Sequence, residues 1–189
     1  MSLSIKNFIV SNIDSKFKPE DDLPFHTDIK EISKHTIITR YNQVEHYAYF
    51  LLEGIVKISM SYNGEERILE FFFPGSFFSS YTSFLTQMPS DVEIEALTDI
   101  RAETIYHKDI CKAYETSLLA NRLGRIVTEQ YYIRKTNREK DFLTKSATER
   151  YMELLAERPE LFRDIPVNMI AKYLGIKPES LSRIRKEIS

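Results

Sequence analysis

The sequence predicts an α+β protein in which a β domain comes first and helices follow. Three observations predict this order. Residues 36–105 contain short β-rich runs separated by turn residues, and apolar residues recur with helical spacing from about residue 108. Acidic and basic side chains are also divided unevenly between these two parts. The 189 residues are enough to bury a core in one or two small domains.

Composition excludes several classes of protein. The five glycines have neither P-loop nor GxGxxG spacing, and the single cysteine, Cys111, excludes a disulfide framework and a four-cysteine metal site. The longest apolar stretches, such as 47–52, are far shorter than the roughly 18 residues of a membrane span, and no signal-peptide layout is present. No metal-ligand spacing or catalytic motif occurs. We therefore expect a cytoplasmic protein that is not an enzyme and has no metal or cofactor.

The β domain is predicted element by element. Residues 1–35 mix polar and apolar side chains, which indicates a short helix followed by a turn at 21–25. Strands are expected in the runs TIITRY, HYAYFLL, IVKISMSY, RILEFFF and VEIEALT. Asn63-Gly64 is a strong hairpin signal, because both residues tolerate the positive φ of a type I′ turn, and Pro74-Gly75 closes the next strand. Spacings of about ten residues favour a sandwich, barrel or roll over an α/β fold.

A heptad pattern follows the β domain. Its apolar seam consists of Leu119, Leu123, Ile126, Gln130 and Ile133. The pattern favours a homodimer formed by a pair of these helices. The alternative is that the stripe packs on the protein's own β domain, and Gly124 weakens an isolated helix by about 1 kcal/mol. The polar stretch 136–146 is predicted as a junction, and the apolar residues of 151–155 as part of a second amphipathic helix ending at Pro159.

The last 24 residues predict a helix-turn-helix. Gly175 supplies a left-handed turn after the first helix, and Pro178 stands at the first position of the second. The first helix has its predicted apolar face at Val167, Ile170, Ala171 and Leu174.

The second of these helices has two distinct faces. Leu181, Ile184 and Ile188 form the predicted buried stripe. Arg183 can donate two hydrogen bonds to guanine, and Glu179 can accept one from cytosine. The candidate DNA-binding residues are Lys177, Glu179, Ser180, Ser182, Arg183 and Lys186. The alternative is a merely solvated terminal helix.

The charge distribution supports DNA binding by the C-terminal part. Residues 1–107 hold 9 basic and 16 acidic side chains, whereas residues 108–189 hold 17 basic and 12 acidic ones. A polyanion attracts the second part and repels the first. The alternative is that two domains differ in charge without functional reason.

The chain resembles the Crp/Fnr superfamily of bacterial transcription regulators. The segments FFFPGSFFSSYTSFL and IAKYLGIKPESLSRIRK are similar to a branch common in Bacteroidetes. The resemblance implies an antiparallel β-roll (double-stranded β-helix) at 1–107, similar to a cyclic-nucleotide-binding domain. It further implies a dimerisation helix and hinge at 108–140 and a helix-turn-helix domain at 141–189. The implied partners are double-stranded DNA, a second copy of the chain and RNA polymerase.

The same resemblance indicates where this sequence departs from the superfamily. Glu179 and Arg183 match its base-contacting Glu and Arg, but a third contact position, often Arg, is Pro178 here. No residues follow Ser189 to form the usual wing hairpin, so phosphate contacts from a wing are not expected.

The phosphate-binding cassette of the superfamily lacks its charges here. Its Glu and Arg positions correspond to Ser80 and Ser90. Burying a phosphate without a paired cation is costly, so we expect no tight binding of cAMP or cGMP. The candidate pocket for an unknown small effector consists of Phe78, Ser79, Ser80, Tyr81 and Ser90. The alternative is that the aromatic residues here fill the core, and that the protein is a ligand-free β-roll scaffold or partner-binding protein.

Overall fold

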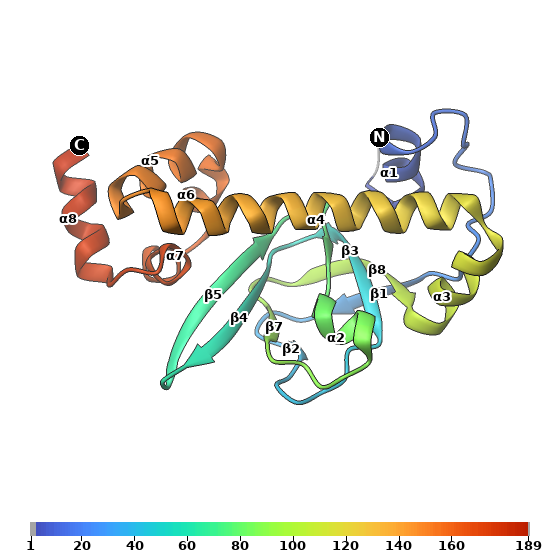
Figure 1. The fold of residues 1–189 in the computed structure, drawn as a ribbon, viewed down its shortest axis with the longest axis horizontal. Coiled ribbons are helices and arrows are strands. Elements are labelled where there is room, and N and C mark those ends of the chain that lie inside the picture. Colours follow the sequence, from blue (N-terminus) through green and yellow to red (C-terminus); the bar gives the residue numbers. More distant parts are fainter. Residues whose placement is uncertain (1–2, 189) are drawn as a thin grey trace. The chain divides into compact units, whose positions relative to one another are not determined.

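The computed structural model describes residues 3–188. In the first part of the chain the elements are α1 (Ile5–Asn12), β1 (Asp28–Ile32), β2 (Ile37–Thr39), β3 (Tyr47–Glu53), β4 (Val56–Tyr62), β5 (Glu65–Phe72), β6 (Phe77–Phe78), α2 (Tyr81–Thr86), β7 (Glu93–Ala96) and β8 (Ile100–Tyr106) (Figure 1). They are followed by α3 (His107–Thr116), α4 (Leu118–Thr144), α5 (Ala147–Glu157), α6 (Pro159–Asp164), α7 (Val167–Leu174) and α8 (Pro178–Ile188). Within residues 3–188, no helix combines the length and apolar character needed to cross a membrane.

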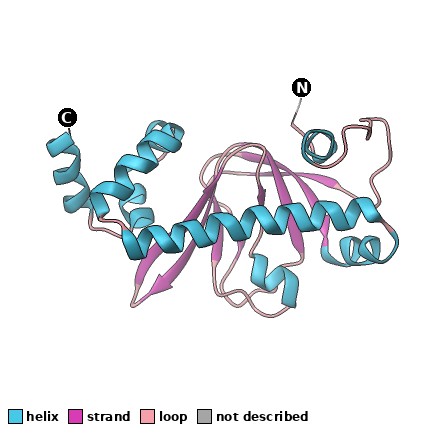
Figure 2. Ribbon diagram, turned by 45° about the horizontal axis from the view of Figure 1, so that its top comes forward, coloured by secondary structure: helices cyan, strands magenta, loops and turns pink. Residues whose placement is uncertain are grey.

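The strands form two four-stranded sheets, with strand orders β1-β8-β3-β6 and β2-β7-β4-β5. Figure 2 shows these strands in magenta. The hairpin between β4 and β5 turns at Asn63 and Gly64, whose φ angles are 52° and 77°. Both values are positive, as a type I′ turn requires. The hairpin prediction is thus confirmed.

Strand β1 corrects the sequence-based prediction, which expected only a short helix and a turn before residue 36. Its sequence, DIKEI, has only two apolar residues, does not alternate strictly between polar and apolar side chains, and remains largely exposed. It pairs antiparallel with β8, with Ile29 opposite Glu103. A short polar strand at the edge of a sheet gives a weak sequence signal, which is why β1 was missed.

The described chain divides into two compact units. Unit 1 contains the residues up to 59 together with 70–129, and unit 2 contains 60–69 together with 130 onward. These boundaries do not coincide with the three predicted domains. The tip of the β4–β5 hairpin belongs to the same unit as the C-terminal helices, which no local sequence pattern indicates.

The core of unit 1 joins α1, strands of the β domain and the helices that follow them. Its buried side chains are Ile5, Ile9, Phe25, Phe50, Leu52, Phe84, Ile105, Ile110, Ala113, Ala120 and Leu123. Several aromatic residues from the cassette region are buried, as the core-filling alternative expected. Helix α1 begins after Ser4, whose hydroxyl accepts a hydrogen bond from the N–H of Asn7, an N-cap arrangement.

Helix α4 is longer than expected. It continues to Thr144, so the polar stretch 136–146 is mainly helix and not the predicted junction. Only Lys145 and Ser146 separate α4 from α5. Long polar side chains such as Lys, Arg and Glu have good helix propensity, so a loss of apolar periodicity does not by itself end a helix.

The predicted heptad seam is divided between two environments. Leu123 is buried in the core of unit 1, and Leu119 packs against that core. This is the alternative that the sequence left open. Ile126 is half-buried, whereas Gln130 is exposed and Ile133 is 57% exposed. The seam residues from 126 to 133 therefore remain accessible in the single chain.

Unit 2 has its own buried side chains from α5 to α8. They are Tyr151, Leu161, Ile165, Ile170, Ala171, Tyr173, Leu174, Leu181 and Ile184. Helix α5 begins with a capping box between Ser146 and Glu149. It ends at Glu157, and Pro159 opens α6, so the predicted end of the amphipathic helix is close to the observed one.

Candidate functional site

Helices α7 and α8 are joined by a tight turn at Gly175. This residue has a φ of 69°, in the left-handed region, and caps the C-terminus of α7. The N–H of Ile176 donates to the carbonyl of Ala171 over 3.0 Å, which closes the turn in the manner of a Schellman motif. Helix α8 then starts at Pro178. Both the glycine turn and the proline start agree with the sequence-based prediction.

Helix α8 presents one buried and one exposed face. Leu181 and Ile184 are buried, while Ile188, predicted to be buried with them, is 38% exposed. Ile188 lies in the last turn of α8, at the edge of the packed face that Leu181 and Ile184 form. Val167, at the start of α7, is likewise 38% exposed and not buried as expected.

Most of the predicted DNA-reading side chains lie on the exposed face of α8, and Lys177 lies in the turn before it. Five of the six candidates are exposed, and Ser180 is half-buried; the exposed ones are Lys177, Glu179, Ser182, Arg183 and Lys186. Within residues 3–188, no hydrogen bond or ion pair engages the side chains of Glu179, Ser182, Arg183 or Lys186. These polar groups are therefore accessible to an external partner.

A cluster around Arg138 holds α7 in place within unit 2. The guanidinium of Arg138 donates to the carbonyl oxygens of Tyr173, at 2.6 Å, and Ile68, at 3.3 Å. It also lies 3.9 Å from the centre of the Tyr173 ring, which is a cation–π contact. Lys172 forms an ion pair of 2.7 Å with Glu66. These contacts connect α4, α7 and the hairpin tip.

Arg150 adds a second cationic contact to this support. It donates to the carbonyl oxygen of Leu174, at 3.2 Å, and lies 4.5 Å from the centre of the Phe142 ring. Burial lowers the pKa of the Arg150 guanidinium. Sequence reasoning missed both Arg138 and Arg150, because their partners are backbone carbonyls distant in the chain.

The cassette residues in unit 1 are occupied by hydrogen bonds to one another. The hydroxyl oxygens of Ser80 and Ser90 are 2.7 Å apart, and both residues are buried. Ser79 donates to the carbonyl oxygen of Tyr47 over 2.9 Å. The ring of Phe78 stacks on that of Tyr49, with their centres 4.8 Å apart. Ser80 and Ser90, which stand where the superfamily has Glu and Arg, thus form an uncharged pair joined by a hydrogen bond.

A buried carboxyl group lies next to the cassette. The N–H of Glu45 donates to the Ser83 hydroxyl over 2.9 Å, and its own carboxylate accepts from the Thr39 hydroxyl and from the N–H of Tyr47. Burial raises the pKa of Glu45, although the hydrogen bond from Thr39 opposes this effect. Sequence reasoning did not select Glu45, since an isolated Glu before a strand carries no motif.

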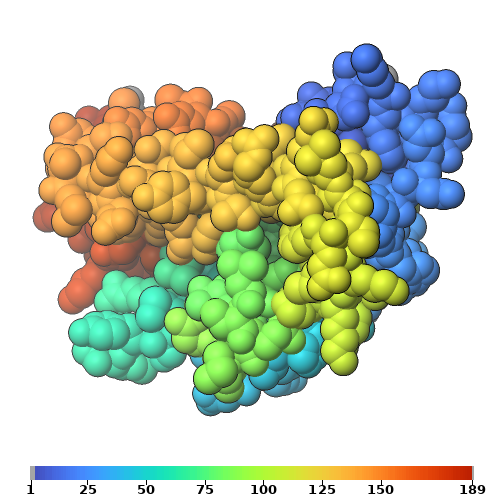
Figure 3. Space-filling view, turned by 45° about the vertical axis from the view of Figure 1, so that its right-hand side comes forward, coloured from blue at the N-terminus to red at the C-terminus, as the bar shows by residue number. Residues whose placement is uncertain are grey.

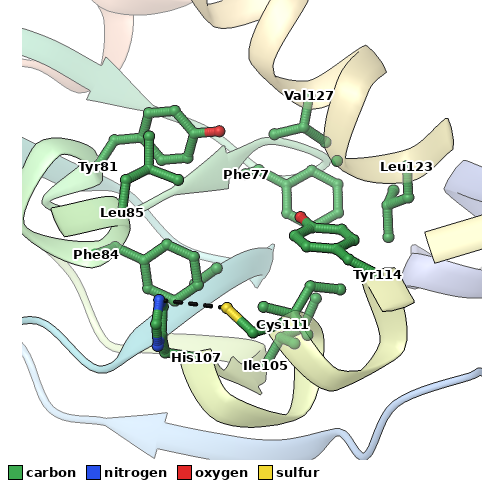
Figure 4. A pocket seen from close by; sticks show the side chains of 13 residues that line it. Phe77, Tyr81, Phe84, Leu85, Ile105, His107, Cys111, Tyr114, Leu123 and Val127 are labelled. Atoms are coloured by element: carbon green, nitrogen blue, oxygen red, sulfur yellow. Dashed lines mark hydrogen bonds between the residues drawn. The ribbon is translucent and has the colours of Figure 1, made fainter. Parts of the chain in front are cut away.

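An apolar pocket of about 120 Å³ lies elsewhere in unit 1 (Figure 4). Its walls come from α2, α3, α4 and neighbouring strands. The lining residues are Ala48, Phe77, Tyr81, Phe84, Leu85, Ile105, His107, Ile110, Cys111, Tyr114, Leu123, Gly124 and Val127. Figure 3 shows residues of α2, in green, beside those of α3, in yellow, on one face of this unit. Of the predicted effector residues only Tyr81 lines this pocket.

His107 and Cys111 lie one helical turn apart on α3 at this pocket. The distance between the His107 Nε2 and Cys111 Sγ atoms is 3.5 Å. Burial lowers the pKa of His107. Within the described residues 3–188, no three His, Cys, Asp or Glu side chains form a cluster suited to a metal ion.

Comparisons with known proteins support the fold. Residues 29–117 match the family model of the cyclic nucleotide-binding domain. FixK2 of Bradyrhizobium japonicum is 19% identical, with a TM-score of 0.73 over 86% of this chain and 84% of that one. The c-di-GMP-responsive global regulator CLP of Xanthomonas campestris is also 19% identical, with a TM-score of 0.68 over 86% of both chains.

A third similar structure is a transcriptional regulator of Eubacterium rectale assigned to the Crp/Fnr family. It is 18% identical, with a TM-score of 0.70 over 86% of this chain and 78% of that one. No protein with a curated description matches the chain. At these identities the likeness establishes the fold, and the domain match confirms that the N-terminal part resembles a cyclic nucleotide-binding domain.

Proposed function

We propose that the protein is a DNA-binding transcription regulator of the Crp/Fnr type. The observation that carries the proposal is the exposed face of α8, where Glu179, Ser182, Arg183 and Lys186 are free of partners among the described residues. The opposite face of the same helix is buried through Leu181 and Ile184. A helix fixed on one side and polar on the other is suited to the major groove.

In this proposal Arg183 and Glu179 select bases. Arg183 donates two hydrogen bonds to the O6 and N7 atoms of guanine, and Glu179 accepts one from the N4 amino group of cytosine. Ser182, Lys186, Lys177 and Ser180 contact sugar and phosphate groups, which position the helix without specifying sequence.

The regulator acts as a homodimer in the cytoplasm. Two chains pair through the accessible part of the α4 seam, and their α8 helices enter successive major grooves about 34–36 Å apart. The operator is therefore a pseudo-palindrome, and RNA polymerase is a further partner. We propose no catalytic role.

The cassette does not serve as a cyclic-nucleotide site in this proposal. The Ser80–Ser90 pair offers no positive charge to a phosphate, and the Glu45 backbone bonds to Ser83 of the same segment, which brings an acidic residue close to it. Isothermal titration with cAMP checks this point. We expect no heat of binding at micromolar concentrations, and micromolar affinity would refute the assignment.

The DNA-reading proposal is tested by selecting bound duplexes from a random library. We expect an inverted-repeat motif, and Arg183→Ala is expected to weaken binding to it by about 1–3 kcal/mol, or roughly 5- to 150-fold. The matched control is Arg185→Ala, which removes the same charge from another side of α8.

Two outcomes of this selection would contradict the proposal. One is the absence of any inverted repeat, which would favour a partner-binding protein without sequence-specific DNA binding. The other is an equal loss of affinity in both arginine variants, because that result would mean that α8 attracts DNA by its positive charge alone and that Arg183 does not select a base.

A further inference from the structure

The apolar pocket between α2, α3 and α4 is close in size to a cavity that holds a small ring. Its volume is about 120 Å³, somewhat below the roughly 150 Å³ of an apolar cavity that binds benzene. The exposed residue Cys111 is part of its lining, so the space is reached from solvent. This site is separate from the Ser80–Ser90 pair, since neither serine lines it.

Gly124 shapes one wall of this pocket. A Cβ atom at this position would lie 2.4 Å from the hydroxyl oxygen of Tyr114 and 2.8 Å from its Cζ atom. Only glycine therefore lets the phenol ring lie directly against α4. Glycine within a helix costs about 1 kcal/mol relative to alanine, and the close approach of Tyr114 is what requires it here.

The hydroxyl of Tyr114 is a hydrogen-bond donor without a protein acceptor. Within residues 3–188, no group forms a hydrogen bond with this hydroxyl. Burial raises the pKa of Tyr114 to about 12, so the hydroxyl keeps its proton at neutral pH. In Figure 4 the hydroxyl points into the space that Tyr81 faces from the other side. Tyr81 already shares a hydrogen bond of 2.5 Å with Thr128.

The pocket wall is uncharged. None of its lining residues is Lys, Arg, Asp or Glu, and burial lowers the pKa of His107, which favours the neutral imidazole. Moving a carboxylate or ammonium group into such a space without a partner costs several kcal/mol. The chemistry of the wall thus selects against charged ligands.

We propose that this pocket binds a neutral molecule of one ring that carries a hydrogen-bond acceptor, with Tyr114 as the donor. The ring packs against Phe77, Phe84 and Val127, and the acceptor oxygen meets the Tyr114 hydroxyl. Such a ligand touches both α2 and α4. Its role as the effector rests on the proposed regulatory function, whereas its binding does not.

Ligand binding to the pocket is measured by the protection of Cys111 from alkylation. Alkylation of Cys111 by iodoacetamide is followed by mass spectrometry in the full-length protein, with phenol, toluene or benzoate added. For one-site binding, phenol at ten times its Kd lowers the fraction of empty pocket about elevenfold, and the alkylation rate falls by up to the same factor. Toluene protects at higher concentration, and benzoate does not protect. The signal reports one site, because the chain has no other cysteine.

Three variants separate the hydrogen bond, the cavity and general effects on the thiol. Tyr114→Phe is expected to weaken phenol protection about fivefold, the value of one hydrogen bond, and to leave toluene protection unchanged. Val127→Phe is expected to fill the cavity and to remove protection by phenol and by toluene. Circular dichroism verifies that this variant is folded. A Glu115→Cys change in a Cys111→Ser background places the thiol on the same helix outside the lining, and no probe should protect it.

Defined results would overturn the inference. Absence of saturable protection by both phenol and toluene would exclude a ligand pocket, and equal protection by benzoate would exclude selection for neutral molecules. Protection by phenol in a protein that selects no DNA motif would leave the pocket standing and refute the proposed function instead. The two proposals therefore fail in distinguishable ways.

Discussion

At the scale of single residues, two positions carry chemistry that their neighbours in sequence do not indicate. Gly124 stands inside α4, where the sequence suggested only a weak point, yet it is the place where Tyr114 meets the helix. Glu45 is a carboxylic acid buried beside the cassette, held by hydrogen bonds from Thr39 and Tyr47. Each makes a separate prediction about stability.

Replacing Gly124 by alanine is expected to destabilise unit 1 despite the higher helix propensity of alanine. The added Cβ atom overlaps the Tyr114 ring, and overpacking of this kind typically costs about 1–3 kcal/mol. In a Tyr114→Ala background the same change should stabilise by up to about 1 kcal/mol. Urea unfolding of the four proteins measures both values, and destabilisation in both backgrounds would contradict the explanation.

Glu45 is expected to make stability depend on pH. Because burial raises its folded-state pKa above the ordinary 4.5, the folded protein holds this proton more tightly than the unfolded chain. The resulting stabilisation is fully present below a pH of 4.5, the ordinary value, and is lost as the pH rises through the folded-state pKa. In urea unfolding, Glu45→Gln should flatten the dependence of the free energy of unfolding on pH in this range. The exposed control Glu115→Gln should not. Identical profiles for Glu45→Gln and the parent protein would refute the prediction.

At the scale of elements, the seam of α4 lies in two different environments along the helix. Leu119 and Leu123 pack in unit 1, whereas Gln130 and Ile133 remain exposed. An exposed isoleucine at a seam position is an unfavourable surface group unless another helix covers it. The α4 seam therefore tests the proposed homodimer directly.

The proposed α4 seam is tested by substituting two adjacent exposed residues, one in the seam and one outside it. Ile133→Glu is expected to convert a dimer into a monomer in sedimentation velocity at micromolar concentration, because it places like charges opposite each other. Tyr132→Glu, at a 68% exposed position outside the seam, is the control and should leave the dimer intact. A parent protein that is already monomeric, or equal effects of both variants, would exclude this interface.

The elements also show which parts of the structure a sequence can predict. Helices α7 and α8 and the turn between them were predicted because their signals are local: Gly175 ends one helix, Pro178 begins the next, and apolar spacing marks the buried faces. The β4–β5 hairpin was predicted from Asn63-Gly64 for the same reason. Strand β1 was missed, because its edge position leaves it polar.

The candidate sites divide in the same way. The exposed face of α8 follows from helical periodicity within a single short segment, whereas the pocket at Tyr114 is assembled from strands and helices between Ala48 and Val127. A pattern within a short stretch of sequence cannot predict that residues so far apart in the chain will line one pocket. The Ser80–Ser90 hydrogen bond similarly required the fold to bring two serines together.

At the scale of the whole molecule, unit 2 is built from two separate segments of chain. The hairpin tip at 60–69 joins residues 130 onward, and Arg138 contacts both Ile68 and Tyr173. A guanidinium that satisfies two carbonyl groups and stacks on a ring contributes more than an exposed ion pair does. Arg138 should therefore stabilise the two segments together.

Arg138→Ala is expected to loosen both segments of unit 2. Hydrogen exchange should become faster at residues 60–69 and 170–176, and unchanged at 47–53 in β3, since the opening is local to the unit that loses the contacts. Lys140→Ala, an exposed position on the same helix, serves as the control. Faster exchange confined to 170–176 would show that the hairpin tip is held independently of Arg138.

The divided composition of unit 2 also limits how the molecule can be recombined. The backbone passes between the units at residues 59, 69 and 129, so no single cut separates a complete unit 1 from a complete unit 2. A chimera joined at residue 129 would inherit a hairpin tip from one parent and its contact partners, Arg138 and Lys172, from the other. Exchange of unit 2 between two such chains therefore requires the hairpin tip to be transplanted along with the C-terminal helices.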